Sequence, residues 1–104
     1  MLSRNLRRGI SCWGLVAEIY RRAGVEITDP VKEPEKAAGE WVQIPWQDRQ
    51  PMDVLTMSKG GKTIGGHVAL YLGRGFVIHA TYDRGTIRER VNADRVLSVH
   101  RRRA

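Results

Sequence analysis

The chain contains one cysteine, Cys12, and three histidines, two of which lie in one short segment. A thiol acts as a nucleophile in its thiolate form, which is stabilised by a helix N-terminus or a neighbouring imidazolium. One histidine can take the thiol proton and return it to a leaving amine, while a second polar group holds the first ring in its working tautomer. Cys12, His67 and His79 supply these three roles in that order, so they are predicted to form a nucleophilic catalytic site.

A helix is predicted to present the cysteine. Residues 12–23, CWGLVAEIYRRA, have apolar side chains at helical spacing, with the charged ones elsewhere. Gly24 follows where a left-handed C-terminal cap is expected, and Ser11 is a plausible N-cap. The helix therefore begins at Cys12.

Both histidines belong to a predicted hairpin, HVALYLGRGFVIHA, that turns around Arg74. Side chains alternate along a strand, so His67 and His79 lie on the same face of adjacent strands. Diagonal neighbours on one face lie about 7–8 Å apart at the backbone, which allows two imidazoles to interact directly or through water.

The rest of the chain predicts an α+β fold in which the helix packs on an antiparallel sheet. Residues 25–51 carry all four prolines and predict a long surface connection with at most one short helical turn, although Trp41 and Trp46 indicate some order. The pattern then changes to short strands. We expect these at 53–57, 67–73, 76–80, 86–91 and 95–101.

Composition limits the remaining choices. A chain of 104 residues has room for one domain, predicted over 1–104, and a single cysteine excludes an internal disulfide. We expect no signal peptide and no membrane insertion, because no apolar run is long enough. The net charge of +7 favours polyanionic partners such as bacterial wall polymers.

Four stretches carry a family resemblance: SCWGLVAEIYRRAGVEI, QPMDVLTM, GGHVALYLG and FVIHAT. They resemble the NlpC/p60-type cell-wall cysteine peptidases, a papain-like group with a Cys, His and polar third residue in this order. In the family motif an aspartate precedes the cysteine and a glycine precedes the aspartate of a "GD" strand. Those positions are Ser11 and Met52 here.

The resemblance implies a papain-like fold and a peptidoglycan endopeptidase that cleaves the stem peptide, commonly between D-glutamate and meso-diaminopimelate. Cys12 would be the nucleophile, His67 the general base and acid, and His79 the orienting residue. Ser11, Trp13 and Gly66 are the expected substrate-binding residues, and no cofactor or metal is implied. The oxyanion would bind backbone amides near Cys12.

Tryptophan directly after the cysteine is similar to the branch of the family found in bacteriophage tails. That branch implies a location in the virion tail, action at the periplasm or cell wall after synthesis in the host cytoplasm, and partners among other tail-tip proteins. A non-catalytic tail-tip protein that retains the fold is the alternative function.

Other interpretations of the same residues remain open. The cysteine could be inert core filler, or one cysteine and two histidines could bind zinc, although no CxxC or HxxxH pair is present. A nucleic-acid binder fits the charge, but no recognised module is present, so no specific nucleic acid is expected. His100, in VHRRRA, is interpreted as a basic residue of the terminus.

Overall fold

The computed structural model describes residues 12–30, 32–59, 62–81 and 84–103, apart from the side chains at 59 and 62–66. Two α-helices, two short 3₁₀ turns (η) and six strands lie in these ranges. In chain order the elements are α2 (Cys12–Arg22), α3 (Pro34–Ala38), β1 (Trp41–Ile44), η1 (Trp46–Asp48), β2 (Val54–Lys59), β3 (Lys62–Gly73), β4 (Phe76–Thr81), β5 (Gly85–Arg90), η2 (Ala93–Arg95) and β6 (Val96–Arg102).

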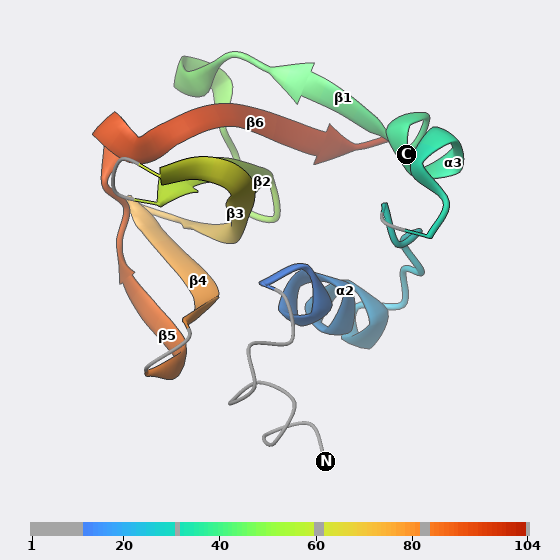
Figure 1. The fold of residues 1–104 in the computed structure, drawn as a ribbon, viewed down its shortest axis with the longest axis horizontal. Helices are drawn as coiled ribbons and strands as arrows, with labels where there is room; N and C mark the ends of the chain where they lie inside the picture. The colour runs from blue at the N-terminus through green and yellow to red at the C-terminus, as the bar shows by residue number, and fades with distance from the viewer. Residues whose placement is uncertain (1–11, 31, 60–61, 82–83, 104) are drawn as a thin grey trace.

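The strands form one antiparallel sheet in the order β1-β6-β2-β3-β4-β5, and α2 lies on one side of it (Figure 1). The predicted α+β fold is therefore confirmed. Strands β2 to β5 follow one another as expected. The last strand does not: β6 pairs with β2, where Leu55 lies opposite Val99. Val99 of β6 is buried, whereas the residues of β5 alternate between half-buried and exposed. Pairing with β2, at the centre of the sheet, therefore buries Val99 as pairing with β5 would not.

The two faces of the sheet have separate hydrophobic clusters, as the alternation of side chains along a strand requires. On one face, α2 contributes Val16 and Tyr20, which pack against Val54 and Leu70 of the sheet. The other face is partly covered by Trp46 of η1. Its buried members are Leu55, Met57, Ala69, Tyr71, Val77 and Val99.

The segment 25–51 has more structure than its sequence predicts. The expected helical turn corresponds to α3, but the interpretation as a surface connection is wrong for residues 41–44, which form β1 and pair with β6. A four-residue strand followed by proline has no local periodicity, so its pairing partner decides its conformation. Trp41 packs edge to face on Trp13 and Tyr20, with ring centroids 5.8 and 5.7 Å apart.

Helix α2 ends as predicted. Gly24 has φ of 87°, and the amide of Val25 donates to the carbonyl of Tyr20, which gives the left-handed cap. The predicted N-cap, Ser11, lies outside the described residues.

The position of α2 over the sheet is fixed at the start of β2. Met52 has φ of 78°, a left-handed conformation that glycine adopts more easily, and its carbonyl accepts a hydrogen bond from the Tyr20 hydroxyl. The next residue, Asp53, is buried and accepts from the Gln50 amide at 2.8 Å and from Nε and Nη2 of Arg101, both at 2.9 Å. These bonds raise the pKa of Arg101 above its ordinary value.

Candidate active site

Cys12 is the first residue of α2, and α2 packs against β3 and β4. Its side chain is half-buried, and its Sγ accepts a hydrogen bond from the backbone amide of Val68 at 3.3 Å. The sulfur therefore lies beside the residue that follows His67 in the chain.

The Val68 amide can bond the sulfur because β3 and β4 separate at this point. Tyr71 donates to the Asp53 carbonyl and accepts from the Met52 amide, so its own amide points toward β2. Amides alternate in direction along a strand, so the amide of Val68, three residues earlier, points toward β4. The pairs between β3 and β4 run from Gly73↔Phe76 to Leu70↔Ile78. Beyond the last pair, the Val68 amide donates to the sulfur of Cys12. In a longer ladder the same amide would donate to a carbonyl of β4.

The two predicted histidines are in direct contact. Nε2 of His67 lies 2.5 Å from Nδ1 of His79, and the ring centroids are 4.8 Å apart. The pairing of Tyr71 with Val77 centres the hairpin on Arg74, as predicted from the sequence. This register is what places the two imidazoles diagonally on one face.

A fourth residue, which sequence reasoning missed, continues the chain of contacts. Nε2 of His79 lies 2.7 Å from Oε2 of Glu89 on β5. Strand β5 pairs Ile87 with His79 and Glu89 with Val77, so Glu89 is a diagonal neighbour of His79. The alternating pattern of residues 86–91 predicts a strand and so places Glu89 on one face of it. The contact of Glu89 with His79 depends in addition on the register between β4 and β5.

Comparison with models of known families shows to which family the chain belongs. The model of the NlpC/P60 family matches residues 3–101. The chain belongs to the NlpC/P60 family. Proteins of this family are generally cysteine peptidases, and the substrate that the family implies is peptidoglycan. The comparison with curated proteins gives no match.

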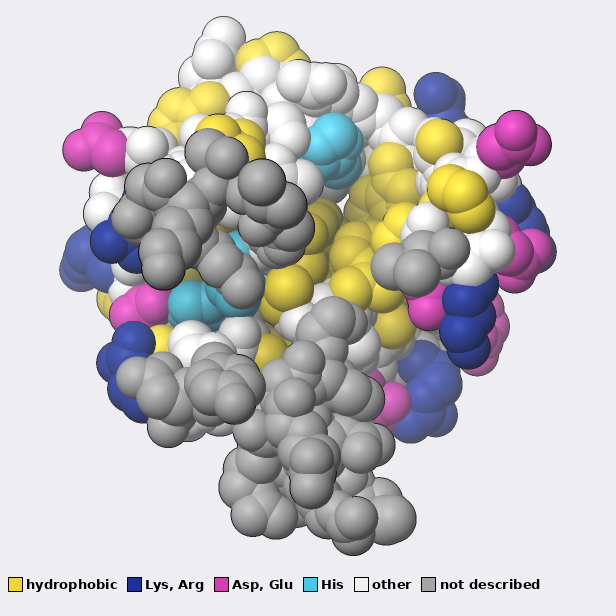
Figure 2. All heavy atoms as spheres, viewed as in Figure 1, with side chains coloured by type: hydrophobic (Ala, Val, Ile, Leu, Met, Phe, Trp, Pro, Cys, Tyr) yellow, Lys and Arg dark blue, Asp and Glu magenta, His cyan; other side chains and the backbone are white. Residues whose placement is uncertain are grey.

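An apolar cavity of about 530 Å³ lies between α2, α3 and the sheet of this NlpC/P60 chain. It is lined by Trp13 and Val68, the neighbours of Cys12 and His67, and by Pro30, Pro34, Ala37, Ala38, Trp41, Gln43, Val54, Thr56 and His100. Figure 2 shows a band of hydrophobic side chains across this face, with histidine side chains beside it. Trp13, predicted to bind substrate, therefore packs on Trp41 and also walls the cavity.

Two polar features of this cavity differ from expectation. The indole nitrogens of Trp13 and Trp41 are buried, and within the described part of the chain neither has a hydrogen-bond partner. His100 is not simply a terminal basic residue, because it is half-buried, contacts the Ser98 hydroxyl at 2.7 Å and lines the cavity. Burial lowers the pKa of His100 below its ordinary value.

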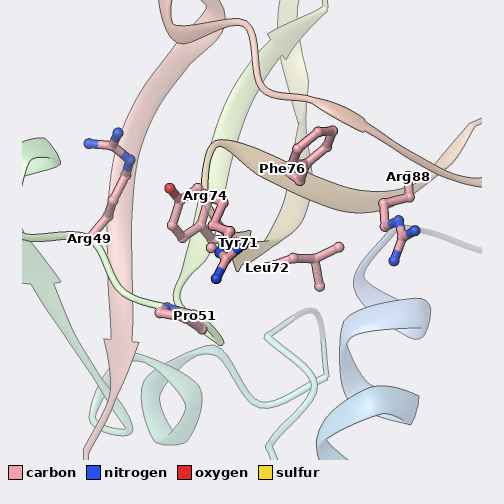
Figure 3. A pocket seen from close by; sticks show the side chains of 8 residues that line it. Arg49, Pro51, Tyr71, Leu72, Arg74, Phe76 and Arg88 are labelled. Atoms are coloured by element: carbon pink, nitrogen blue, oxygen red, sulfur yellow. The ribbon is translucent and has the colours of Figure 1, made fainter.

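A second cavity, of about 490 Å³, lies at the turn between β3 and β4 and includes Arg49, Arg74 and Arg88 among its lining residues. In Figure 3 the three guanidinium groups lie apart and do not converge on a common point. Arg49 instead stacks on Trp46, with its guanidinium carbon 3.8 Å from the ring centroid. This cavity therefore lacks the geometry of a site for one small anion.

The structure places the Cys12 sulfur on the amide of the residue after His67 and puts His67 in contact with His79, and Trp13 follows Cys12 in α2. Gly66 lies in β3 directly before His67, and Ser11 lies outside the described residues. Among the residues that the structure describes, no group of three or more His, Cys, Asp or Glu side chains is arranged to hold a metal ion. No helix in the described ranges is long and apolar enough to span a bilayer.

Proposed function

We propose that this protein is a cysteine endopeptidase that hydrolyses the stem peptide of peptidoglycan. Cys12 is the nucleophile, His67 the general base and acid, and His79 the residue that orients His67. The observation that carries the proposal is that the Cys12 sulfur accepts from the amide of Val68, the residue after His67, beyond the last pair of the β3–β4 ladder, while His67 contacts His79. Membership of a family of cell-wall peptidases supports the same chemistry.

The contact between the two histidines supports a separate role for each ring nitrogen of His67. Its Nε2 contacts His79, so Nδ1 is the ring nitrogen that exchanges a proton with the thiol. The thiolate attacks the amide carbonyl, and His67 passes its proton to the leaving amine, which leaves a thioester on Cys12. Water, deprotonated by His67, then releases the carboxylic acid and restores the thiol. Backbone amides in the first turn of α2 are the expected donors to the oxyanion.

Substrate recognition is proposed along the apolar cavity next to the nucleophile. Trp13 forms one wall of it and Val68 another, so a side chain of the peptide that enters the cavity lies beside the sulfur. Ser11 and Gly66, adjacent in sequence to Cys12 and His67, are proposed to border the same groove. The net charge of +7 favours association with anionic wall polymers.

We propose a bacteriophage tail as the setting, with other tail-tip proteins as partners and the periplasm or cell wall as the place of action. The support is Trp13 directly after the cysteine, the pattern of the tail-associated branch that the sequence resembles.

The first test measures alkylation of Cys12 by iodoacetamide from pH 4 to 9 in the wild type and in His67→Ala. Because the chain has one cysteine, all the signal comes from Cys12. We expect a rate that stays high well below pH 8, because an imidazolium partner maintains the thiolate, and we expect His67→Ala to abolish it. Release of stem-peptide fragments from purified peptidoglycan, followed by mass spectrometry, should require both residues.

Cys12→Ser provides the matched control for hydrolysis, and circular dichroism verifies that each variant folds. The proposal would be contradicted by an alkylation rate that rises only near the pKa of a free thiol, about 8.5, and is the same in the wild type and in His67→Ala. Intact peptidoglycan after prolonged incubation would contradict it as well. Either result would favour the non-catalytic tail-tip protein.

A further inference from the structure

We propose that Glu89 is a positioning residue that sets which nitrogen of His79, and through it of His67, carries the proton. This inference rests on the proposed function of Cys12 and His67. Its basis is an unbroken line of contacts: Glu89 Oε2 to His79 Nε2 at 2.7 Å, and His79 Nδ1 to His67 Nε2 at 2.5 Å.

The direction of each hydrogen bond follows from the first member of the line. An ionised carboxylate only accepts hydrogen bonds, so Nε2–H of His79 must be the donor and Oε2 of Glu89 the acceptor. In a neutral imidazole the other nitrogen then has a free electron pair, so Nδ1 of His79 accepts from Nε2–H of His67. The lone pair of neutral His67 is thereby on Nδ1, the nitrogen that exchanges a proton with the thiol.

Neighbouring groups keep Glu89 suited to this task. Nη2 of Arg84 lies 3.9 Å from Oε1, the oxygen that His79 does not use. The imidazole of His79 is 11% exposed while the carboxylate of Glu89 is 42% exposed, so the inner ring is shielded and the outer acceptor reaches water. The carboxylate therefore keeps contact with water, and its position on β5 does not bury a charge.

Glu89 is not required to hold β5 in place. Strand β5 pairs with β4 along its length, from Phe76↔Arg90 to Thr81↔Gly85, through backbone hydrogen bonds that a substitution of the side chain leaves intact. Variants at this position should therefore fold, which makes the role of the side chain testable.

The decisive experiment replaces the acceptor by groups with different hydrogen-bonding capacity. Glu89→Gln offers either a carbonyl or an amide to His79, so both tautomers are accepted, whereas Glu89→Lys can only donate and selects the opposite tautomer. Loss of outer hydrogen-bond partners of histidine costs about 10-fold to 100-fold in metal sites, and we expect that scale in kcat here, with Glu89→Lys the slower and KM little changed. Glu89→Asp should restore part of the rate.

Glu26→Gln and Glu26→Lys are matched controls, because Glu26 is exposed and lies between α2 and α3, not in the strands that carry the histidines. They should hydrolyse and alkylate like the wild type. If net charge alone set the rate, the variants at positions 26 and 89 would change it alike. The contrast between the two positions therefore isolates the effect of the hydrogen bond.

The tautomers themselves are read from the ¹⁵N shifts of the imidazole rings. We expect Nε2–H on neutral His79 and His67 in the wild type, a mixture in Glu89→Gln, and Nδ1–H on both in Glu89→Lys. The same protonated nitrogen in all three proteins would overturn the inference, as would equal rates at position 89.

Failure of this inference can be told apart from failure of the proposed function. If the wild-type thiol is activated through His67 but the position-89 variants match it, only the role of Glu89 fails. If the wild-type thiol is not activated, the proposed function fails, and the ¹⁵N shifts still report whether Glu89 sets the tautomers.

Discussion

At the scale of single residues, Asp53 is a buried carboxylate whose partners are the Arg101 guanidinium and the Gln50 amide. It follows Met52, whose carbonyl receives the hydroxyl of Tyr20 from α2. Asp53 therefore secures the turn that holds α2, the helix that begins with Cys12, in position over the sheet.

We expect Asp53→Asn to lower the free energy of unfolding by about 2–4 kcal/mol, because it removes the charge that compensates Arg101 and leaves one acceptor where there were two. Urea denaturation followed by circular dichroism measures it. Asp94→Asn, at an exposed position, is the control and should change stability little. Equal midpoints for the two variants would show that the buried pair contributes nothing.

His100 gives the protein a specific sensitivity to acid. Burial lowers its pKa in the folded state below the ordinary value of 6.5. Below pH 6.5 the unfolded chain therefore binds more protons at this residue than the folded chain, so stability falls as the pH falls toward the folded pKa. We expect His100→Gln to lose less Tm than the wild type between pH 7 and pH 5. Parallel curves of Tm against pH for the two proteins would contradict this.

The residues of the candidate site differ in how far sequence could find them. Cys12, His67 and His79 follow from helix periodicity and from a hairpin centred on Arg74, both of which are local patterns. Glu89 depends on the register of a second hairpin, because the pairing of Val77 with Glu89 sets its diagonal contact with His79 and a shift of one residue would turn its side chain to the other face.

At the scale of elements, the end of the β3–β4 ladder matters most, because beyond it the Val68 amide, next to His67, bonds the Cys12 sulfur of α2. Helix α3 matters next, since it closes one side of the apolar cavity through Ala37 and Ala38. Local sequence predicts the helical turn at α3 but not β1 beside it. Strand β1 is defined by pairing with β6, which is more than fifty residues away.

The cavity can be tested through α3. Ala38→Trp places a large side chain at its exposed rim, so we expect KM for a stem-peptide fragment to rise several-fold while alkylation by the much smaller iodoacetamide is unchanged. Ala38→Ser leaves the cavity open and is the matched control. An unchanged KM in Ala38→Trp would place substrate binding elsewhere.

At the scale of the whole molecule, the sheet separates two hydrophobic clusters, and α2, which begins with Cys12, packs on one of them. The order of the strands could not be derived from the sequence, because a meander and a sheet with β6 inserted beside β2 have the same alternation along each strand. Burial of Val99 against Leu55 distinguishes them, and it is a property of the assembled core.

Glu89 lies on β5, the strand at the end of the described sheet, which is paired there only with β4. Terminal strands open at a lower free energy than the centre of a fold, since they bury fewer groups and break fewer hydrogen bonds when they detach. Warming therefore releases the carboxylate from His79 while α2, β2 and β3 are still assembled. If the protein acts as proposed, we expect loss of activity on warming to precede loss of the fold and to reverse on cooling.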